Sequence, residues 1–400
     1  MFGDYMRFIK GAHRDVLFFL GGGFLVGFAM TGFNLLFNLY MKEAGFGEGT
    51  IGSLLSAQVF TTALLTLPAA FVVRRFRIKL FLMLMPIIGG IGQAIVISGF
   101  VVPRMYAGMV VVGIASVFRS VIGGPLLMER TSAEARAHFF SLNFAVGLLS
   151  GITGNLVAGS LPHLFSRLGY DAVSGYRYAI LIHLAVGAMS VLFYSRVKLR
   201  RIAEISNDNG FFHIHSSPWL VVMLIIPPLI VGLGAGLTVP FLNLYFRDRF
   251  SLSSRSIGAL FATVQFAMVT GLLIAPWIAK RIGKIRTVML SQLLSVPFLL
   301  VLGLSFSFPL SVVAFVARAT LMNMAQPLIT NFALEQVAPA DRSLISGAMN
   351  VAWLSAWGMS ANIGGRLIES YGYLLPFTIT AICYVISTFL YGVLYLPKES

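Results

Sequence analysis

Twelve apolar stretches, each long enough to cross a lipid bilayer as a helix, divide the chain of 400 residues. A helix of about 20 residues rises roughly 30 Å, which matches the hydrocarbon core of a bilayer. Charged residues make up only 11% of the chain and hydrophobic residues 58%, whereas about a quarter of the residues of soluble domains are charged. We therefore expect an all-α membrane protein with twelve transmembrane helices, over residues 15–41, 50–73, 79–100, 103–128, 138–161, 177–196, 218–246, 255–279, 286–306, 309–333, 343–366 and 373–396.

The segment before the first stretch is basic like a signal peptide, but no small-residue cleavage site follows its apolar run. The first stretch is therefore expected to be a retained span. Cys383 is the only cysteine, so the chain can form neither a disulfide within itself nor a cysteine metal cluster. His213 and His215 have no third ligand nearby, so neither a metal site nor a cofactor is expected.

The net charge of +15 is distributed unevenly between the two sides of the predicted membrane. With the N-terminus inside, 19 lysines and arginines fall on the cytoplasmic side and eight on the other side. This bias follows the positive-inside rule and predicts a multi-pass protein of the cell membrane with both termini in the cytoplasm. The placement of these cations relative to the lipid bilayer accounts for the net positive charge, so no nucleic acid partner is expected. We expect the protein to be a monomer.

The chain repeats itself with an offset of 206 residues. The stretch GTIGSLLSAQVF corresponds to RSIGALFATVQF at that offset, and the motif FNLY corresponds to LNLY within one residue of it. Because each half holds six helices, both halves enter the membrane in the same orientation, as a parallel repeat. The predicted domains are an N-terminal half over 1–196, a cytoplasmic linker over 197–217 and a C-terminal half over 218–400. Arg75, Glu129 and Arg136 correspond to Arg281, Glu335 and Arg342.

Two parallel six-helix halves, a basic central loop and a basic loop between helices 2 and 3 together resemble the major facilitator superfamily over the whole chain. The family pattern G-x-x-x-D-R-x-G-R-R is similar to AKRIGKIR, which supplies Arg281, Gly283 and Lys284. VVRRFRIK is its counterpart in the first half. In both stretches a cation, Arg74 or Lys280, stands where the family has an aspartate.

The motif R-x-x-x-G of proton-coupled drug exporters in this family resembles FRSVIGGP on helix 4, with Arg119 and Gly123. The glycine-rich run GLLSGITGNLVAG on helix 5 is similar to that of exporters but lacks their proline. The E-x-x-x-x-x-x-R spacing after helices 4 and 10 resembles that of sugar porters. The resemblance therefore implies a transporter without naming its solute.

Charged residues at the cytoplasmic helix ends of each half form a predicted gate. A carboxylate among guanidinium groups makes charge-assisted, bidentate hydrogen bonds. We expect these bonds to form when the two halves close on that side and to break on opening. The alternative is a set of exposed loop charges, whose pairs contribute about 0–1 kcal/mol each. The predicted gating residues are Arg75, Glu129, Arg136, Arg281, Glu335 and Arg342.

Two arginines and several amides inside the apolar spans predict a polar cavity. An arginine at the bilayer centre costs roughly 2.5–3.5 kcal/mol, and no acidic residue lies well inside a predicted span to offset that cost. Water, carbonyls, amides or a polar or anionic solute are the remaining partners. The alternative for each residue is a structural bond that holds helices together. The predicted substrate-binding residues are Asn34, Asn38, Gln58, Arg119, Asn143, Asn243, Gln265, Arg318, Asn323, Gln326, Asn350 and Trp353.

These features favour a secondary transporter of a small organic solute. The chain has no Gly-x-x-x-x-Gly-Lys loop, so a gradient is the expected energy source. No nucleophile, base and metal ligand converge, so an enzyme is not expected. The leading hypothesis is efflux of amphiphilic or anionic compounds by alternating access, with H+ as the candidate coupling ion. Two alternatives are uptake of a sugar or organic anion by symport or uniport, and a lipid-translocating or non-transporting protein on the same scaffold.

Overall fold

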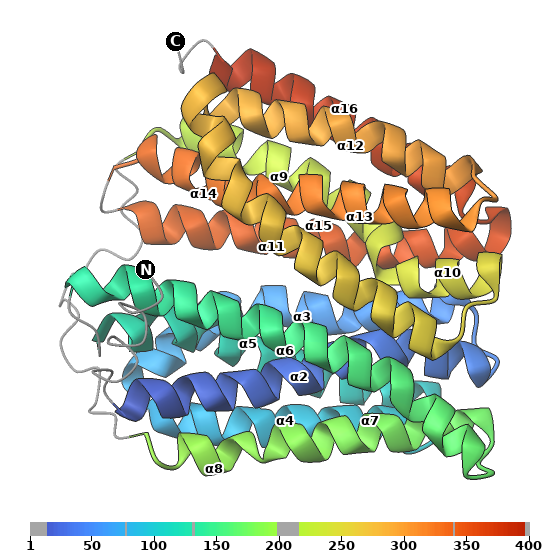
Figure 1. The fold of residues 1–400 in the computed structure, drawn as a ribbon. Helices are drawn as coiled ribbons and strands as arrows, with labels where there is room; N and C mark the ends of the chain where they lie inside the picture. Colours follow the sequence, from blue (N-terminus) through green and yellow to red (C-terminus); the bar gives the residue numbers. More distant parts are fainter. Residues whose placement is uncertain (1–13, 77, 130–132, 198–215, 339–340, 397–400) are drawn as a thin grey trace. The chain divides into compact units, whose positions relative to one another are not determined.

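The computed structural model describes residues 14–76, 78–129, 133–197, 216–338 and 341–396, without the side chains of residues 67, 70, 74–75, 119–141 and 343. Every regular element in these ranges is a helix (Figure 1). The elements are α2 (Arg14–Glu43), α3 (Glu48–Arg75), α4 (Ile78–Ile97), α5 (Val102–Glu129), α6 (Ala133–Arg167), α7 (Ala172–Ala188), α8 (Ser190–Tyr194), α9 (Pro218–Thr238), η1 (Val239–Phe241), α10 (Leu242–Phe250), α11 (Ser254–Ile282), α12 (Lys284–Leu304), α13 (Phe308–Met324), α14 (Gln326–Glu335), α15 (Arg342–Tyr371) and α16 (Leu374–Tyr395).

These helices fall on the twelve predicted spans, so the predicted fold class is confirmed. Nine spans are single helices, and three are interrupted, as α7–α8, as α9–η1–α10 and as α13–α14. Within the described residues, ten segments are long and apolar enough to cross a membrane. Helix α15 has the necessary length but carries polar residues such as Asn350 and Arg366.

The helix ends repeat with the offset found in the sequence. Helices α12 and α13 begin 206 residues after α4 and α5. A buried hydrogen bond repeats as well: the Tyr40 hydroxyl donates to the Ile97 carbonyl at 3.3 Å, and the Tyr245 hydroxyl donates to the Leu302 carbonyl at 2.7 Å. The repeat therefore extends from the sequence to these helix bounds and to one buried contact.

Prolines explain two of the interrupted spans. Proline has no backbone N–H, so it removes the regular helical hydrogen bond to the carbonyl four residues earlier. Pro240 removes the bond to Gly236 at η1, and Pro327 removes the bond to Asn323 where α13 gives way to α14. These breaks leave irregular backbone inside otherwise apolar segments, which membranes tolerate only where it is packed in protein or lines water.

The contacts between residues divide the chain into two compact units. Unit 1 comprises Met1–Glu43, Leu64–Asn207 and Ser254–Ala262, and unit 2 comprises Ala44–Ala63, Asp208–Ser253 and Thr263–Ser400. The first turns of α11 therefore pack in unit 1, and the first turns of α3 pack in unit 2.

Glycines permit close backbone contacts where these turns pack. In unit 1, the Ser254 hydroxyl donates to the Gly159 carbonyl at 2.9 Å, and a Cβ added to Gly258 would clash with the Asn155 carbonyl oxygen. In unit 2, a Cβ added to Gly365 would clash with the Glu48 carbonyl oxygen. A side chain at either glycine would force the backbones apart.

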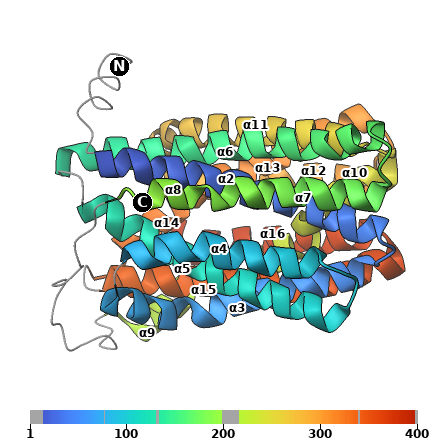
Figure 2. The same ribbon diagram turned by 90° about the horizontal axis from the view of Figure 1, so that it is seen from below.

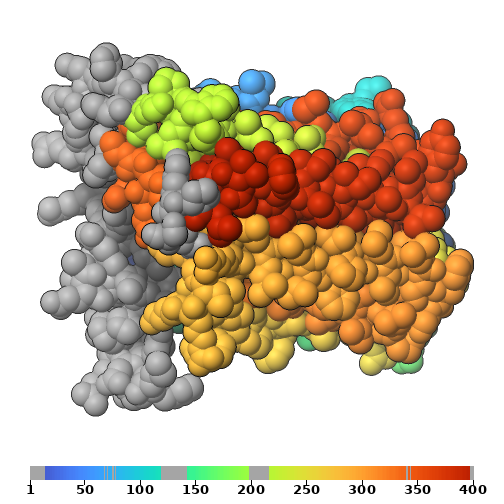
Figure 3. Space-filling view, turned by 90° about the horizontal axis from the view of Figure 1, so that it is seen from above, coloured from blue at the N-terminus to red at the C-terminus, as the bar shows by residue number. Residues whose placement is uncertain are grey.

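Each unit packs its helices side by side. In unit 1, α4 packs on α5, and α2 packs on α6, α7 and α8 (Figures 1 and 2). In unit 2, α9 packs on α15 and α16, and α12 packs on α16 and α13. Figure 3 shows α12 and α16 as adjacent ridges of one face. The exposed residues of α16 are apolar, as lipid contact requires, namely Leu374, Leu375, Ile382, Val385, Ile386, Phe389 and Val393.

Candidate functional site

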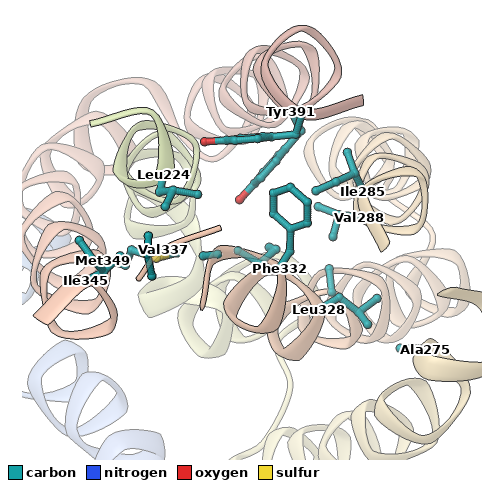
Figure 4. Packing of buried hydrophobic residues seen from close by; sticks show 14 of the residues in the cluster. Leu224, Ala275, Ile285, Val288, Leu328, Phe332, Val337, Ile345, Met349 and Tyr391 are labelled. Atoms are coloured by element: carbon teal, nitrogen blue, oxygen red, sulfur yellow. The ribbon is translucent and has the colours of Figure 1, made fainter. Parts of the chain in front are cut away.

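Helix α14 of unit 2 has one apolar face and one polar face. Its apolar face, Leu328, Ile329, Phe332 and Ala333, is buried. Figure 4 shows Leu328 and Phe332 within a cluster that includes Ile285, Val288 and Tyr391 from α12 and α16. The opposite face is exposed, and we call Gln326, Thr330 and Asn331 the α14 polar face.

Exposed amides inside a membrane span must meet water or a polar ligand rather than lipid. Hydrocarbon cannot satisfy their hydrogen bonds, and each unsatisfied group costs several kcal/mol. Many other exposed positions of the spans are apolar, for example Leu84 and Ile91 on α4 and Phe389 on α16. The α14 polar face therefore marks a water-accessible side of unit 2.

Helix α15 brings Asn350 to a similar depth. Asn350 is exposed and lies eight residues after Arg342, the first residue of α15. Gln326 lies nine residues before Glu335, the last residue of α14. At 1.5 Å per residue, both amides are roughly 12–14 Å from these helix ends. Helices α14 and α15 are in contact, so both exposed amides lie on neighbouring helices of unit 2.

Cations from two neighbouring helices hold the end of α14. The Lys284 ammonium group donates to both carboxylate oxygens of Glu335, at 2.5 and 2.6 Å. The Arg342 Nε donates to the Leu334 carbonyl at 3.0 Å, a favourable position for a cation near a helix C-terminus. The Arg281 guanidinium stacks on the Trp277 ring at 3.8 Å. We call this end, with Lys284, Arg281 and Arg342, the basic end of unit 2.

Replacing Glu335 with glutamine is expected to change the free energy of unfolding by less than about 1 kcal/mol, because exposed ion pairs contribute little. The Lys284 and Glu335 side chains are 32% and 48% exposed. Thermal unfolding at low and high salt measures the effect, which should shrink as salt screens the pair. Lys280→Gln is the control for charge removal at the same end. A salt-independent loss well above that of the control would contradict a surface pair.

In unit 1, Asn34 is the only exposed residue between positions 18 and 43 of α2. Asn38, one turn further along, is buried at 2% exposure. Asn143 is exposed on α6. Gln58 lies half-buried on α3, in the part of that helix that packs in unit 2. Of these four predicted residues, Asn34 and Asn143 are therefore the most open to a solute.

Other predicted binding residues of unit 2 have partners within their own unit. Arg318 is only 5% exposed, donates to the Tyr384 hydroxyl of α16 and has a buried Nε without a hydrogen-bond partner in the described part of the chain. The Asn243 side-chain oxygen accepts from the Leu244 N–H at 2.9 Å. The Asn323 amide donates to the Ala319 carbonyl at 2.8 Å.

Gln265 and Trp353 complete the predicted set in unit 2. Gln265 is half-buried on α11. Trp353 is half-buried on α15, with its ring centre 6.5 Å from that of Trp357. The predicted residues Arg75, Arg119, Glu129 and Arg136 have side chains that lie outside the described residues.

Sequence reasoning missed Thr330, Asn331 and Lys284. The signal for the first two was the placement of the polar residues Gln326, Thr330, Asn331 and Glu335, which all fall within one half of a helix of 3.6 residues per turn. Lys284 belongs to the basic motif AKRIGKIR, in which the sequence predicts Arg281 as the gating residue. Arg281 and Lys284 are three residues apart, and no rule of sequence spacing says which of them pairs with the distant carboxylate of Glu335.

Paired helical repeats with a polar face inside apolar spans define a multi-pass membrane transport protein. The sequence profile of the Major Facilitator Superfamily matches residues 19–361 and 228–400. The chain belongs to the major facilitator superfamily. A search of curated protein sequences found no significant match.

Solved transporter structures share this fold. The nucleoside transporter NupG superposes with a TM-score of 0.75 at 14% identity, over 95% of this chain and 99% of that one. A bacterial homologue of the human lysosomal transporter Spinster, in an inward-facing and occupied conformation, gives a TM-score of 0.79 at 14% identity, over 96% and 97%. The human organic anion transporter MFSD10 gives 0.65 at 18% identity, over 94% and 99%.

Proposed function

We propose that the protein moves a small, neutral or anionic organic solute across the cell membrane by alternating access. The observation that carries this proposal is the α14 polar face, which offers amide and hydroxyl groups at membrane depth. Acidic residues of the described spans lie near helix ends, as Asp15, Glu48 and Glu335 do. A cationic solute would therefore find no carboxylate in the middle of these spans.

The direction and coupling that we favour are efflux of an amphiphilic or anionic compound in exchange for H+. The exporter-like motif at Arg119 supports this choice. The proton is then carried by a carboxylate near a helix end, with Glu335 as the described candidate, or by the acid group of the solute. Glu335 is half-exposed and adjoins the α14 polar face, where it can meet water.

A second candidate is uptake of a sugar-like solute or an organic anion. Amide and hydroxyl side chains on one helix face suit a solute with many hydroxyl groups, because each can donate or accept a hydrogen bond. Structures with a similar fold include a nucleoside transporter and an organic anion transporter. The same polar face serves both candidates, and they differ in the solute and in the direction of the gradient.

The moving parts that we propose are the N-terminal half, 1–196, and the C-terminal half, 218–400, joined by the linker 197–217. The positive charge of the basic end supports its placement in the cytoplasm with both termini. Glu335 and Arg342 fix the end of α14 within its own half, and we propose that they and their first-half counterparts, Glu129 and Arg136, stabilise the cytoplasmic gate. A monomer is sufficient for this mechanism.

Counterflow in proteoliposomes tests the proposed function. Vesicles are preloaded with one unlabelled solute from a panel of nucleosides, sugars, organic anions and lipophilic cations, and entry of the same labelled solute is followed with and without a pH gradient. We expect labelled solute of a neutral or anionic class to accumulate in the vesicles. We also expect an inward proton gradient to accelerate efflux of the preloaded solute. Counterflow confined to lipophilic cations would overturn the proposed solute class, and accumulation that ignores the pH gradient would overturn the coupling.

A further inference from the structure

We propose that unit 1 contains a separate binding site for an unbranched hydrocarbon chain, in a cavity within its own helix bundle. The cavity has a volume of about 70 Å³ and lies between α2, α4, α5, α7 and α8. Met30, Met85, Gly90, Gln93 and Val112 are among the residues that line it. None of the predicted substrate-binding or gating residues lines this cavity, so the inference does not depend on the proposed transport function.

Small residues create the space. Gly89, Gly90, Gly187 and Ala115 line the cavity, from α4, α7 and α5. A Cβ added to Gly90 would meet no atom within 4 Å, whereas one added to Gly89 would lie 3.2 Å from the Ala115 Cβ. Gly90 therefore faces open space, and a larger side chain at this position would enter the cavity.

The internal repeat allows the cavity-lining positions of unit 1 to be compared with their counterparts in unit 2. Val112 corresponds to Arg318 at the offset of 206 residues, and Met85 and Gly89 correspond to Ser291 and Ser295. In unit 2 the long Arg318 side chain extends toward α16 and donates to Tyr384, and both serines are buried with hydroxyl hydrogen bonds of their own. Unit 1 carries a short apolar side chain at the position of Arg318 and keeps a cavity beside it.

The lining selects an apolar ligand. Thirteen of its sixteen lining residues are apolar or glycine, and Ser116 and Tyr194 add one hydroxyl each. Its side-chain amide, Gln93, is 2% exposed and donates to the Met30 sulfur at 3.4 Å. A buried water needs two to four polar partners, and apolar cavities stay dry and accept apolar molecules. A volume of about 70 Å³ corresponds to roughly five to seven water positions at about 10–15 Å³ each. The space therefore suits the end of a hydrocarbon chain and not a polar solute.

The surrounding surface makes a membrane lipid the source of that chain. Leu84, Ile87 and Ile91 of α4 are exposed apolar residues, as are Leu192 and Phe193 of α8. These helices both border the cavity, so acyl chains of the bilayer lie against its walls. A free fatty alcohol offers the same chain without the lipid headgroup, and the test separates the two sources.

Photolabelling of the full-length protein tests the site. The protein is placed in nanodiscs that contain phosphatidylcholine with a diazirine at the end of one acyl chain, and labelled peptides are identified by mass spectrometry. Because Leu84, Ile87 and Ile91 of α4 are exposed in every variant, the label is assigned to single residues. We expect label on Met30 and Met85 themselves, and at least a tenfold loss at these two residues in Gly90→Leu. The α16 peptide with Phe389, exposed on its helix, is the internal standard and should label equally in both proteins.

Gly23→Leu is the matched control, because a Cβ at Gly23 also meets no atom within 4 Å and Gly23 does not line the cavity. It should label like the wild type. Gly90→Ala, a smaller change, should give an intermediate loss if Gly90→Leu does not fold. Equal cavity labelling in all variants, or none in the wild type, would overturn the proposal. A diazirine-bearing fatty alcohol that labels where the phospholipid does not would overturn the lipid as source.

Discussion

Replacing Tyr384 with phenylalanine is expected to destabilise the protein by about 1.5–3 kcal/mol, the usual contribution of a hydrogen bond to a charged group. The Tyr384 hydroxyl accepts a hydrogen bond from Arg318, and the two residues are 0% and 5% exposed. The variant would leave a buried guanidinium with one partner fewer, besides its Nε, which has no hydrogen-bond partner among the described residues. Thermal unfolding in detergent, read as a shift in Tm, measures the loss.

The matched control is Tyr391→Phe on the same helix. Tyr391 is 3% exposed, and its hydroxyl is buried without a hydrogen-bond partner in the described part of the chain. Removing that hydroxyl should be neutral or stabilising, because no bond is lost. A Tyr384→Phe effect no larger than that of Tyr391→Phe would show that the bond to Arg318 contributes nothing to stability.

The double variant Arg318→Met, Tyr384→Phe separates structure from transport. Replacing both partners of a buried polar pair by apolar groups is often nearly neutral or stabilising. We expect the double variant to recover most of the stability lost in Tyr384→Phe. Because Arg318 reaches α16 inside unit 2, the same variant should retain transport. Loss of transport with full stability would place Arg318 in the solute path after all.

The succession of helices along the chain could be predicted from the sequence, because hydropathy and the internal repeat are properties of whole helices. The predicted span 309–333 covers α13 and most of α14, and the repeat offset reappears in the helix bounds. The amide pair on helix 1 shows where this reasoning stops. Asn34 and Asn38 share one side of an ideal helix, yet Asn34 is exposed and Asn38 is buried. The exposure of a side chain depends on whether a neighbouring helix covers that turn, and the spacing of residues within one helix does not determine this.

The polar face of α14 was obscured for a different reason. Averaging hydropathy over a span removes the contrast between its faces. The apolar residues Leu328, Ile329 and Phe332 therefore outweigh the polar Thr330 and Asn331 in the average. The break at Pro327 sets α14 apart as a short helix of ten residues with its own apolar side. Similarly, the partner of Glu335 depends on how α12 begins, and Lys284 is the first residue of that helix.

Replacing both Gln326 and Asn331 with leucine is expected to lower the transport rate at subsaturating solute by roughly 5- to 150-fold. Each variant side chain removes a hydrogen bond to a neutral solute, worth about 0.5–1.5 kcal/mol, and every 1.4 kcal/mol corresponds to a factor of about ten. Both amides are exposed, so their loss should leave the Tm near that of the wild type. Initial counterflow rates in proteoliposomes, normalised to inserted protein, measure the effect.

Asn323→Leu is the matched control for this double variant, because it removes an amide from the same span that already donates to the carbonyl of Ala319 within its own helix. A side chain engaged in that way has less to offer a solute, so we expect its rate to stay within about threefold of the wild type, which is less than 1 kcal/mol. If the double variant transports as well as Asn323→Leu while both remain folded, the α14 polar face does not line the solute path. The exposed amides Asn34, Asn143 and Asn350, tested singly as leucine variants, would then be the remaining candidates for that path.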